Sequence, residues 1–292
     1  MNKNNGIIQC EILSDINFEG NKESIKSIEG FVPCKKTLLT ALNNSEFELY
    51  YQPQINIQTM EVTGFESLIR WNHPQKNILT PGFFITYAEQ TGAIEQIGEW
   101  VIYESCQQLN LWKKESQFKG NMSINISVIQ FQNDNFVMVV KEILKKTNTN
   151  PESLIFELTE SLPLKNSTII QNLYALRDLG IKLSLDDFGT GYSSLSYIDN
   201  LPIQEIKIDR SFIKKIKYHE ESFCYPVLDM IINTGKLLNL KVVAEGVENP
   251  LQLTYLGKSD CDTVQGYFFS PPMPKKVIPK WLINWKENKI HS

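Results

Sequence analysis

The chain has 292 residues, with 29 lysines and arginines against 33 aspartates and glutamates, which gives a formal net charge of -4 at neutral pH. This balance excludes a general polyanion binder held by bulk positive charge, and we expect no DNA or RNA duplex among its partners. Apolar residues make up 42% of the chain, which is typical of a globular protein rather than a disordered or collagenous one.

The compartment and the type of metal site follow from what the sequence lacks. No stretch reaches the roughly 20 uncharged apolar residues of a membrane-spanning helix. The 5 cysteines are scattered and have no CxxC spacing, which predicts reduced thiols in a cytoplasmic protein. The 3 histidines lack the spacing of a zinc site, so a metal site in this chain would be built from oxygen ligands, which favour magnesium, manganese or calcium.

Three segments are predicted along the chain. Residues 1–35 are polar and are expected to be a tail or the remnant of a linker. Short β-rich runs then alternate with amphipathic stretches over residues 36–285, which we expect to form one domain. Residues 286–292 are expected to be a C-terminal tail.

The predicted elements alternate between strands and helices. The strands are expected at residues 47–57, 62–70, 122–127, 154–158, 182–186, 205–208, 241–244 and 264–269. Helices are expected at residues 81–90, 94–114, 128–146, 167–179, 221–238 and 251–256, with Gly180 and Asn239 at helix ends. This alternation predicts an α/β fold, a (β/α)8 TIM-like barrel. A doubly wound open sheet is the alternative, but no GxGxxG turn follows the first strand.

Polar residues near the carboxyl ends of the strands interrupt runs that should be apolar in a buried parallel sheet. They are Glu66, Asn125, Glu157, Asp186, Asp187, Lys207, Glu245 and Gln265. Taken singly, each has an ordinary explanation, such as helix capping by Asn125 or a Lys207 that reaches to solvent. Jointly, so many carboxylates at one barrel mouth would repel one another and take up protons unless cations hold them charged.

The same set predicts a site for two divalent ions, because its acidic and amide residues supply enough hard oxygen ligands. The adjacent pair Asp186 and Asp187 is suited to bridging the ions, and two ions about 3.5 to 4 Å apart are the usual device for phosphodiester hydrolysis. Lys207 could fix the attacking water or offset charge in the transition state. Glu160 should face away from Glu157 on a straight strand, so we expect it to anchor the glycine-bearing loop from Phe188 to Ser194.

An ordered set of motifs extends through residues 36–285. It consists of YYQPQI at 50–55, ESLIRW at 66–71, FFITYAEQTG ending at Gly92 after Pro81, INIS at 124–127, ELTE at 157–160, DDFGTGYSSL at 186–195, KIDRSF at 207–212, AEGVE at 244–248 and QGYFFSPPMP at 265–274. Together these motifs resemble the EAL domain family of cyclic di-GMP-specific phosphodiesterases. The name-giving triplet reads Glu66-Ser67-Leu68, with serine in place of alanine.

The resemblance implies hydrolysis of cyclic di-GMP to linear pGpG in bacterial signalling, with two Mg²⁺ or Mn²⁺ ions as cofactors and Ca²⁺ as an inhibitor. It implies that Glu66, Asn125, Glu157 and Asp186 hold one ion, and that Asp186 and Asp187, with Glu245, hold the second. Lys207 would orient the nucleophilic water, while Glu245 is an alternative general base, and the two roles stay open at this point. Gln265 would complete the site near the water.

The resemblance also implies substrate contacts and an assembly. Gln52, Leu68 and Arg70 would contact the substrate, Arg70 through a phosphate, as suits a guanidinium fork. Tyr267 is expected to line the nucleotide pocket. Glu248 and the loop from Phe188 to Ser194 would support the site and a homodimer contact. The family's first strand runs antiparallel to the others.

Two other classes of function stay open. A member of such a family can be a cyclic di-GMP receptor or an interaction module without turnover, but every proposed ligand is present here, which favours an enzyme. A metal-dependent barrel enzyme acting on enolates would also use carboxylates at strand ends. It would not account for the ordered motifs or for Arg70.

Overall fold

A computed structural model describes residues 32–116, 118–160, 163, 166–190, 201–217 and 225–290, except for the side chains of 288–290. Predictions for residues 1–31 and for loop residues 191–194 therefore lie outside the described residues. Within the described part, no helix is both long and apolar enough to cross a membrane. Cys34, Cys106 and Cys261 are free thiols.

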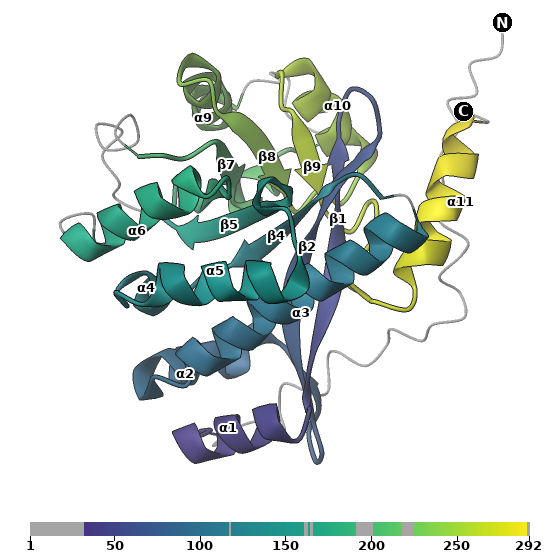
Figure 1. Ribbon diagram of the computed structural model, residues 1–292. Coiled ribbons are helices and arrows are strands. Elements are labelled where there is room, and N and C mark those ends of the chain that lie inside the picture. The colour runs from purple at the N-terminus through teal and green to yellow at the C-terminus, as the bar shows by residue number, and fades with distance from the viewer. Residues whose placement is uncertain are drawn as a thin grey trace, which may run out of the picture.

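Eight strands close into a barrel (Figure 1). They are β1 (Phe47–Asn56), β2 (Val62–His73), β4 (Asn121–Asn125), β5 (Leu154–Thr159), β6 (Lys182–Phe188), β7 (Glu205–Ile208), β8 (Lys241–Glu245) and β9 (Thr263–Gln265). β1 is antiparallel to both of its barrel neighbours, β2 and β9, and the other neighbouring pairs are parallel. The short strands β3 (Asn77–Leu79) and β10 (Met273–Pro274) extend β2 and β1. The predicted TIM-like barrel and its antiparallel first strand are confirmed.

Helices surround this barrel, and Figure 1 shows α3 and α5 lying along its outer side. They are α1 (Lys35–Asn43), η4 (Pro81–Phe83), α2 (Ile85–Thr91), α3 (Ile94–Glu115), α4 (Val128–Phe131), α5 (Phe136–Thr147), η5 (Pro151–Ser153), α6 (Ser167–Asp178), α8 (Arg210–Ile213), α9 (Pro226–Leu237), α10 (Pro250–Lys258) and α11 (Ile278–Ile290). Ser127 and Asn249 each form a capping box at the start of α4 and α10, which satisfies backbone N–H groups that the first turn leaves free.

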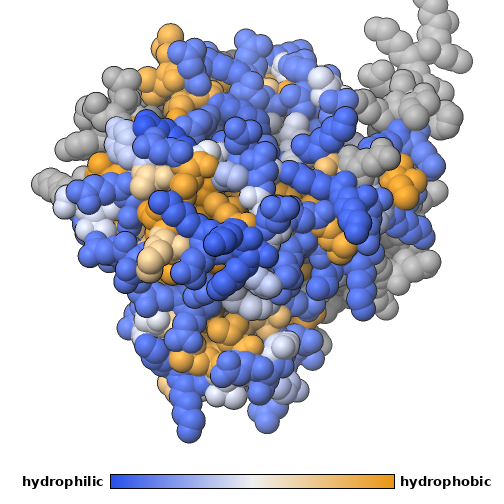
Figure 2. Space-filling model, in the orientation of Figure 1, coloured by the Kyte–Doolittle hydropathy of each residue, from blue (hydrophilic) through white to orange (hydrophobic). Residues whose placement is uncertain are grey.

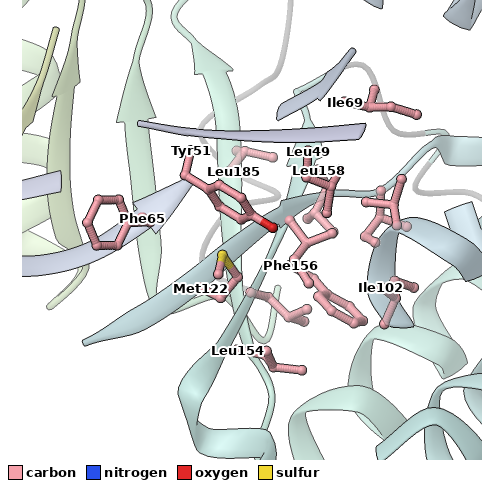
Figure 3. Close-up of a cluster of buried hydrophobic side chains, with 14 of the residues drawn as sticks. Leu49, Tyr51, Phe65, Ile69, Ile102, Met122, Leu154, Phe156, Leu158 and Leu185 are labelled. Atoms are coloured by element: carbon pink, nitrogen blue, oxygen red, sulfur yellow. The ribbon is translucent and has the colours of Figure 1, made fainter. Parts of the chain in front are cut away.

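The hydrophobic core lies between the strands and the helices rather than inside the barrel. Figure 3 shows part of it, with Phe65 and Tyr51 of the first two strands and with Phe156 of β5 next to Ile102 of α3. Side chains alternate along a strand, so the residues between these core positions point into the barrel lumen. The face of the molecule in Figure 2 is mostly hydrophilic, with hydrophobic side chains visible between polar ones.

Several predicted elements differ from the structure. The helix expected over residues 81–90 is divided into η4 and α2. The helix expected over residues 128–146 is divided into α4 and α5 by a turn, in which the Asn133 side chain accepts a hydrogen bond from the Asn135 N–H at 2.9 Å. The strand expected over residues 264–269 ends at Gln265. Gly266 lies so close to the backbone of Val247 that a Cβ atom there would be 2.1 Å from the Val247 carbonyl oxygen, and the chain turns at this point.

The ends of the domain stay a prediction. α1 begins at Lys35, next to the expected start of the domain at residue 36. α11 continues to Ile290, through most of the segment that we expected to be a C-terminal tail.

Candidate active site

The barrel strands bring the predicted polar residues to one end of the lumen. β2, β4, β5, β6, β7, β8 and β9 contribute Glu66, Asn125, Glu157, Asp186, Lys207, Glu245 and Gln265 respectively, and β1 contributes Gln52. Strand register places Asn125 beside Glu157 and Glu245 beside Gln265. The side chains converge because neighbouring parallel strands end at the same edge of the barrel.

Lys207 is the centre of this cluster and has no exposed surface. Its Nζ lies 2.6 Å from Glu245 Oε1 and 2.9 Å from Glu157 Oε2. It also lies 3.3 Å from Asp186 Oδ1 and 3.7 Å from Glu66 Oε2. Burial by itself would lower the pKa of Lys207, but the surrounding carboxylates outweigh burial and raise its pKa well above the usual value. Lys207 is therefore a fixed positive charge.

One lysine does not neutralise the carboxylates around it. Burial raises the pKa of Glu157 well above its usual value and raises the pKa of Glu245 to about 8, despite the attraction of Lys207. Burial and the nearby Asp186 also raise the pKa of Asp187. Glu66 differs: burial acts to raise its pKa, but Lys207 and the hydrogen bonds that Glu66 accepts lower it overall. Without further cations, part of this cluster holds protons at neutral pH.

The arrangement of oxygen atoms fits divalent cations. Asp186, Asp187 and Glu245 each offer a carboxylate oxygen, and these oxygens all lie within 4.8 Å of one another. Glu157 Oε1 is buried and has no hydrogen-bond partner within the described residues, so it is available as a ligand beside Glu66 and Asn125. Hard carboxylate and amide oxygens are the ligands that Mg²⁺ and Mn²⁺ prefer.

Backbone geometry explains how two adjacent aspartates reach the same site. Adjacent residues on a regular strand point to opposite faces. Asp187 has a positive φ of 55°, and the pairing of β6 with β7 shifts register between Leu185 and Phe188. This irregularity redirects the Asp187 side chain, so that its carboxylate gathers with those of Asp186 and Glu245. The left-handed conformation is unfavourable for a non-glycine residue and is concentrated at functional sites.

Amide side chains hold Glu66 in place. Asn125 Nδ2 donates to Glu66 Oε1 at 2.8 Å, and Gln265 Nε2 donates to Glu66 Oε2 at 2.5 Å. Gln265 Nε2 also donates to Gln52 Oε1 at 2.9 Å, and Gln52 donates to the Ser270 carbonyl oxygen at 3.0 Å. The predicted residues Gln52, Asn125 and Gln265 thus form one hydrogen-bonded chain around Glu66.

One predicted substrate residue, Leu68, lines a cavity beside the cluster. Leu68 lines this cavity of about 350 Å³ together with Glu66, Asn125 and Glu157. The guanidinium of Arg70 lies 5.4 Å from the centre of the Tyr50 ring and donates to the Ile69 carbonyl oxygen. Tyr267 is 68% exposed, as an aromatic side chain open to a ligand would be.

Glu160 connects two strand ends, in the geometry expected of a loop anchor. Its carboxylate accepts a hydrogen bond from the Gly189 N–H at 2.9 Å, and its own N–H donates to the Asp186 carbonyl oxygen at 3.2 Å. The backbone N–H of Glu248 donates to Gln252 at 2.7 Å, at the start of α10.

Sequence reasoning assigned no role to Glu89 and Ser127. The Ser127 hydroxyl donates to Glu89 Oε1 at 2.6 Å, and both residues line the cavity next to Leu68. Glu89 belongs to a motif noted in the sequence, but it lies on α2 rather than on a strand, so strand alternation could not direct it to the barrel mouth. Tyr50 was likewise not assigned, although it stacks with Arg70.

Comparisons with known proteins show which sequences and structures this chain is similar to. The sequence profile of the EAL domain family matches residues 35–272. Signaling protein YkoW of Bacillus subtilis is 41% identical over 265 residues, which is 90% of this chain and 32% of YkoW. The bifunctional diguanylate cyclase/cyclic di-GMP phosphodiesterase MucR of Pseudomonas aeruginosa is 39% identical over 245 residues, which is 82% of this chain and 35% of MucR.

The fold is similar to that of solved structures. The PaMucR phosphodiesterase in complex with c-di-GMP has a TM-score of 0.78 and 39% identity, covering 83% of this chain and 98% of that one. The chain spans about a third of the length of the curated relatives it matches, 32% of YkoW and 35% of MucR.

Proposed function

The chain belongs to the EAL domain family, and on that premise we propose that it is a metal-dependent phosphodiesterase that hydrolyses cyclic di-GMP to linear pGpG in bacterial signalling. The observation that carries the proposal is the buried Lys207 surrounded by Glu66, Glu157, Asp186 and Glu245. A binding module needs no such charged cluster, whereas metal-dependent phosphodiester hydrolysis needs carboxylates to hold its cations.

Two ions would share this cluster. Glu66, Asn125, Glu157 and Asp186 would hold one, and Asp186, Asp187 and Glu245 would hold the other. When bound, Mg²⁺ or Mn²⁺ would supply electrostatic stabilisation of the attacking and leaving oxygens. Ca²⁺ is expected to inhibit, because it takes more ligands at longer distances and so disturbs a site shaped for the smaller ions.

Lys207 and Glu245 have different surroundings, which supports different roles. Lys207 Nζ is fully buried among carboxylates, so it would keep its proton, supply a permanent positive charge and hold the surrounding carboxylates in position. The Glu245 side chain is 21% exposed at the barrel mouth, where water has access to it. Glu245 would therefore accept the proton of the attacking water, and Gln265 would contact that water from the neighbouring strand.

The cavity beside the cluster suits one end of the nucleotide. Its wall combines apolar side chains such as Leu68 and Ile85 with the polar pair Glu89 and Ser127, as nucleotide pockets do. Arg70 would bind a phosphate, oriented by the ring of Tyr50. Tyr267 would contact a base from the exposed side.

Product analysis tests the proposal. Cyclic di-GMP is incubated with the purified protein and excess Mg²⁺ or Mn²⁺, and the products are separated by chromatography. We expect linear pGpG from the wild type and none from Glu66→Ala, with Glu142→Gln, at an exposed position of α5, as a control of unchanged activity. Tight binding without turnover would contradict the enzyme and indicate a receptor, and neither binding nor turnover would indicate an interaction module.

A homodimer and a cytoplasmic location are part of the same proposal. The α9 helix exposes Val227, Met230 and Leu237, which are 52%, 54% and 83% accessible, and a second copy of this chain would cover such a face. Light scattering should then give a dimer for the wild type and for Met138→Lys on α5, and a monomer for Met230→Lys. A monomeric wild type would contradict the dimer.

A further inference from the structure

The barrel lumen beneath the carboxylate cluster is lined by small and polar side chains. Residues two positions before the cluster on the parallel strands, and two positions after it on the antiparallel β1, point into the same lumen, one step deeper. These positions are Gln54, Gly64, Ser123, Ile155, Ser184, Glu205, Val243 and Thr263. Bulky branched residues usually fill the interior of such barrels. Here Ser184 and Thr263 are small, while the space beside Gly64 is taken by the Gln54 side chain, whose Oε1 lies 2.8 Å from where a Cβ atom of residue 64 would be.

Three polar atoms at this depth have no hydrogen-bond partner in the part of the chain that the structure describes. They are Ser184 Oγ, Glu205 Oε1 and Thr263 Oγ1. The side chains are closed off from solvent, because Ser184 and Thr263 are 0% exposed and Glu205 is 3% exposed. Leaving buried polar atoms unbonded is costly, so native proteins satisfy nearly all of them with protein groups or with ordered water.

Strand register and strand order relate the three residues. Ser184 is the register neighbour of Glu205 on β7. Thr263 lies on β9, which is separated from β7 by β8. Thr263 comes two residues before the cluster residue Gln265, and Glu205 comes two residues before the cluster residue Lys207. Positions so related on alternate strands contribute to the same layer of a barrel interior. Two hydroxyl groups and a carboxylate oxygen therefore face one region of the lumen.

The chemistry of these groups identifies the ligand. A carboxylate oxygen needs a donor, while each hydroxyl needs an acceptor and offers a donor. Water meets all of these needs at once. We propose that ordered water molecules occupy the lumen beneath the cluster, held by Ser184, Glu205 and Thr263. This buried water site is distinct from the ion sites and does not depend on the proposed function.

Two lysines flank this water site, one on the side of the carboxylate cluster and one on the opposite side. Lys207 lies above it, one step further along β7 from Glu205. Below it, the other oxygen of Glu205 accepts a hydrogen bond from Lys241 Nζ at 3.0 Å, and the Lys241 side chain is 34% exposed. The water keeps Glu205 hydrated inside the barrel, which allows a charged residue to lie under the active site.

A high-resolution crystal structure of the protein tests the site directly. We expect at least one water peak within hydrogen-bond distance of two of the three atoms. Absence of density in the lumen, with the side chains turned to bond protein groups instead, would overturn the proposal. A peak with the ligand number and short distances of a metal ion would overturn it as well.

Thr263→Val gives an independent test, because it replaces the hydroxyl with a methyl group of similar size. If water binds Thr263, the substitution removes a hydrogen bond and should lower the Tm by about 2 to 4 °C. If the lumen is dry, it removes an unbonded hydroxyl, and an unchanged or higher Tm would overturn the proposal. Thr149→Val is the matched control, since the Thr149 hydroxyl is bonded to Asn110 and Thr147 and its loss should lower the Tm.

Discussion

Glu245→Gln should change how the stability of the metal-free protein depends on pH. The pKa of Glu245 is raised to about 8 from an ordinary value of 4.5, chiefly by burial. The folded protein therefore keeps a proton that the unfolded chain releases. The free energy of unfolding is then largest below about pH 4.5, falls as the pH rises, and levels off above about pH 8.

The size of this effect follows from the shift. Each pKa unit corresponds to about 1.4 kcal/mol, so Glu245 accounts for a fall of at most about 5 kcal/mol between pH 4.5 and pH 8. The amide of Glu245→Gln does not titrate in this range, and its oxygen can still accept from Lys207 Nζ, which lies 2.6 Å from the Glu245 carboxylate. The variant should match the wild type near pH 5 and be more stable than it at pH 8.

Urea unfolding in EDTA at several pH values between 5 and 8 measures this difference. Glu142→Gln is the control, because Glu142 lies in an exposed ion pair with Lys146 on α5 and should keep the wild-type slope. Saturating Mg²⁺ should raise the free energy of unfolding of the wild type at pH 8 more than that of the variant, because cations bind the charged carboxylates. A wild type whose stability stays flat or rises from pH 5 to 8, or a variant with the same slope, would refute the reasoning.

Three further substitutions test other parts of the site. Arg70→Lys should raise KM for cyclic di-GMP about tenfold with little change in kcat, because an ammonium group cannot form the paired hydrogen bonds that a guanidinium makes to a phosphate. A KM equal to that of the wild type in steady-state assays would argue against phosphate binding by Arg70. Gly98→Ala would place a Cβ atom 2.2 Å from the Gln130 side chain, so urea unfolding should show a loss of about 1 to 3 kcal/mol, and equal stability would contradict the packing. Glu160→Gln should weaken Mn²⁺ binding about 10-fold or more in calorimetry, because the charged acceptor of the Gly189 N–H is lost; unchanged affinity would remove its anchoring role.

The barrel and most of its cluster were predictable because both follow from side-chain alternation. A polar residue such as Glu157 or Lys207 inside an otherwise apolar strand can point only into the lumen, and the strand ends then bring such residues together. The positions of the site-bearing strands were therefore predicted to within three residues, apart from the last, which ends at Gln265.

Features that depend on local backbone geometry or on distant packing were not predictable. The sequence predicted that Asp186 and Asp187 share one site, but alternation alone would send them to opposite faces, so the positive φ of Asp187 that brings both there was not predicted. The bond between Ser127 and Glu89 joins residues 38 positions apart on different elements, and no local pattern indicates it. The turn at Gly266 arises from a close approach to Val247, which only the folded chain contains.

Anomalous diffraction from crystals soaked with Mn²⁺ tests the central claim most directly. The account predicts two peaks about 3.5 to 4 Å apart. One would lie among Glu66, Asn125, Glu157 and Asp186, and the other among Asp186, Asp187 and Glu245. A single peak away from Asp187, or no peak next to Lys207, would contradict a two-ion phosphodiesterase centre in this barrel.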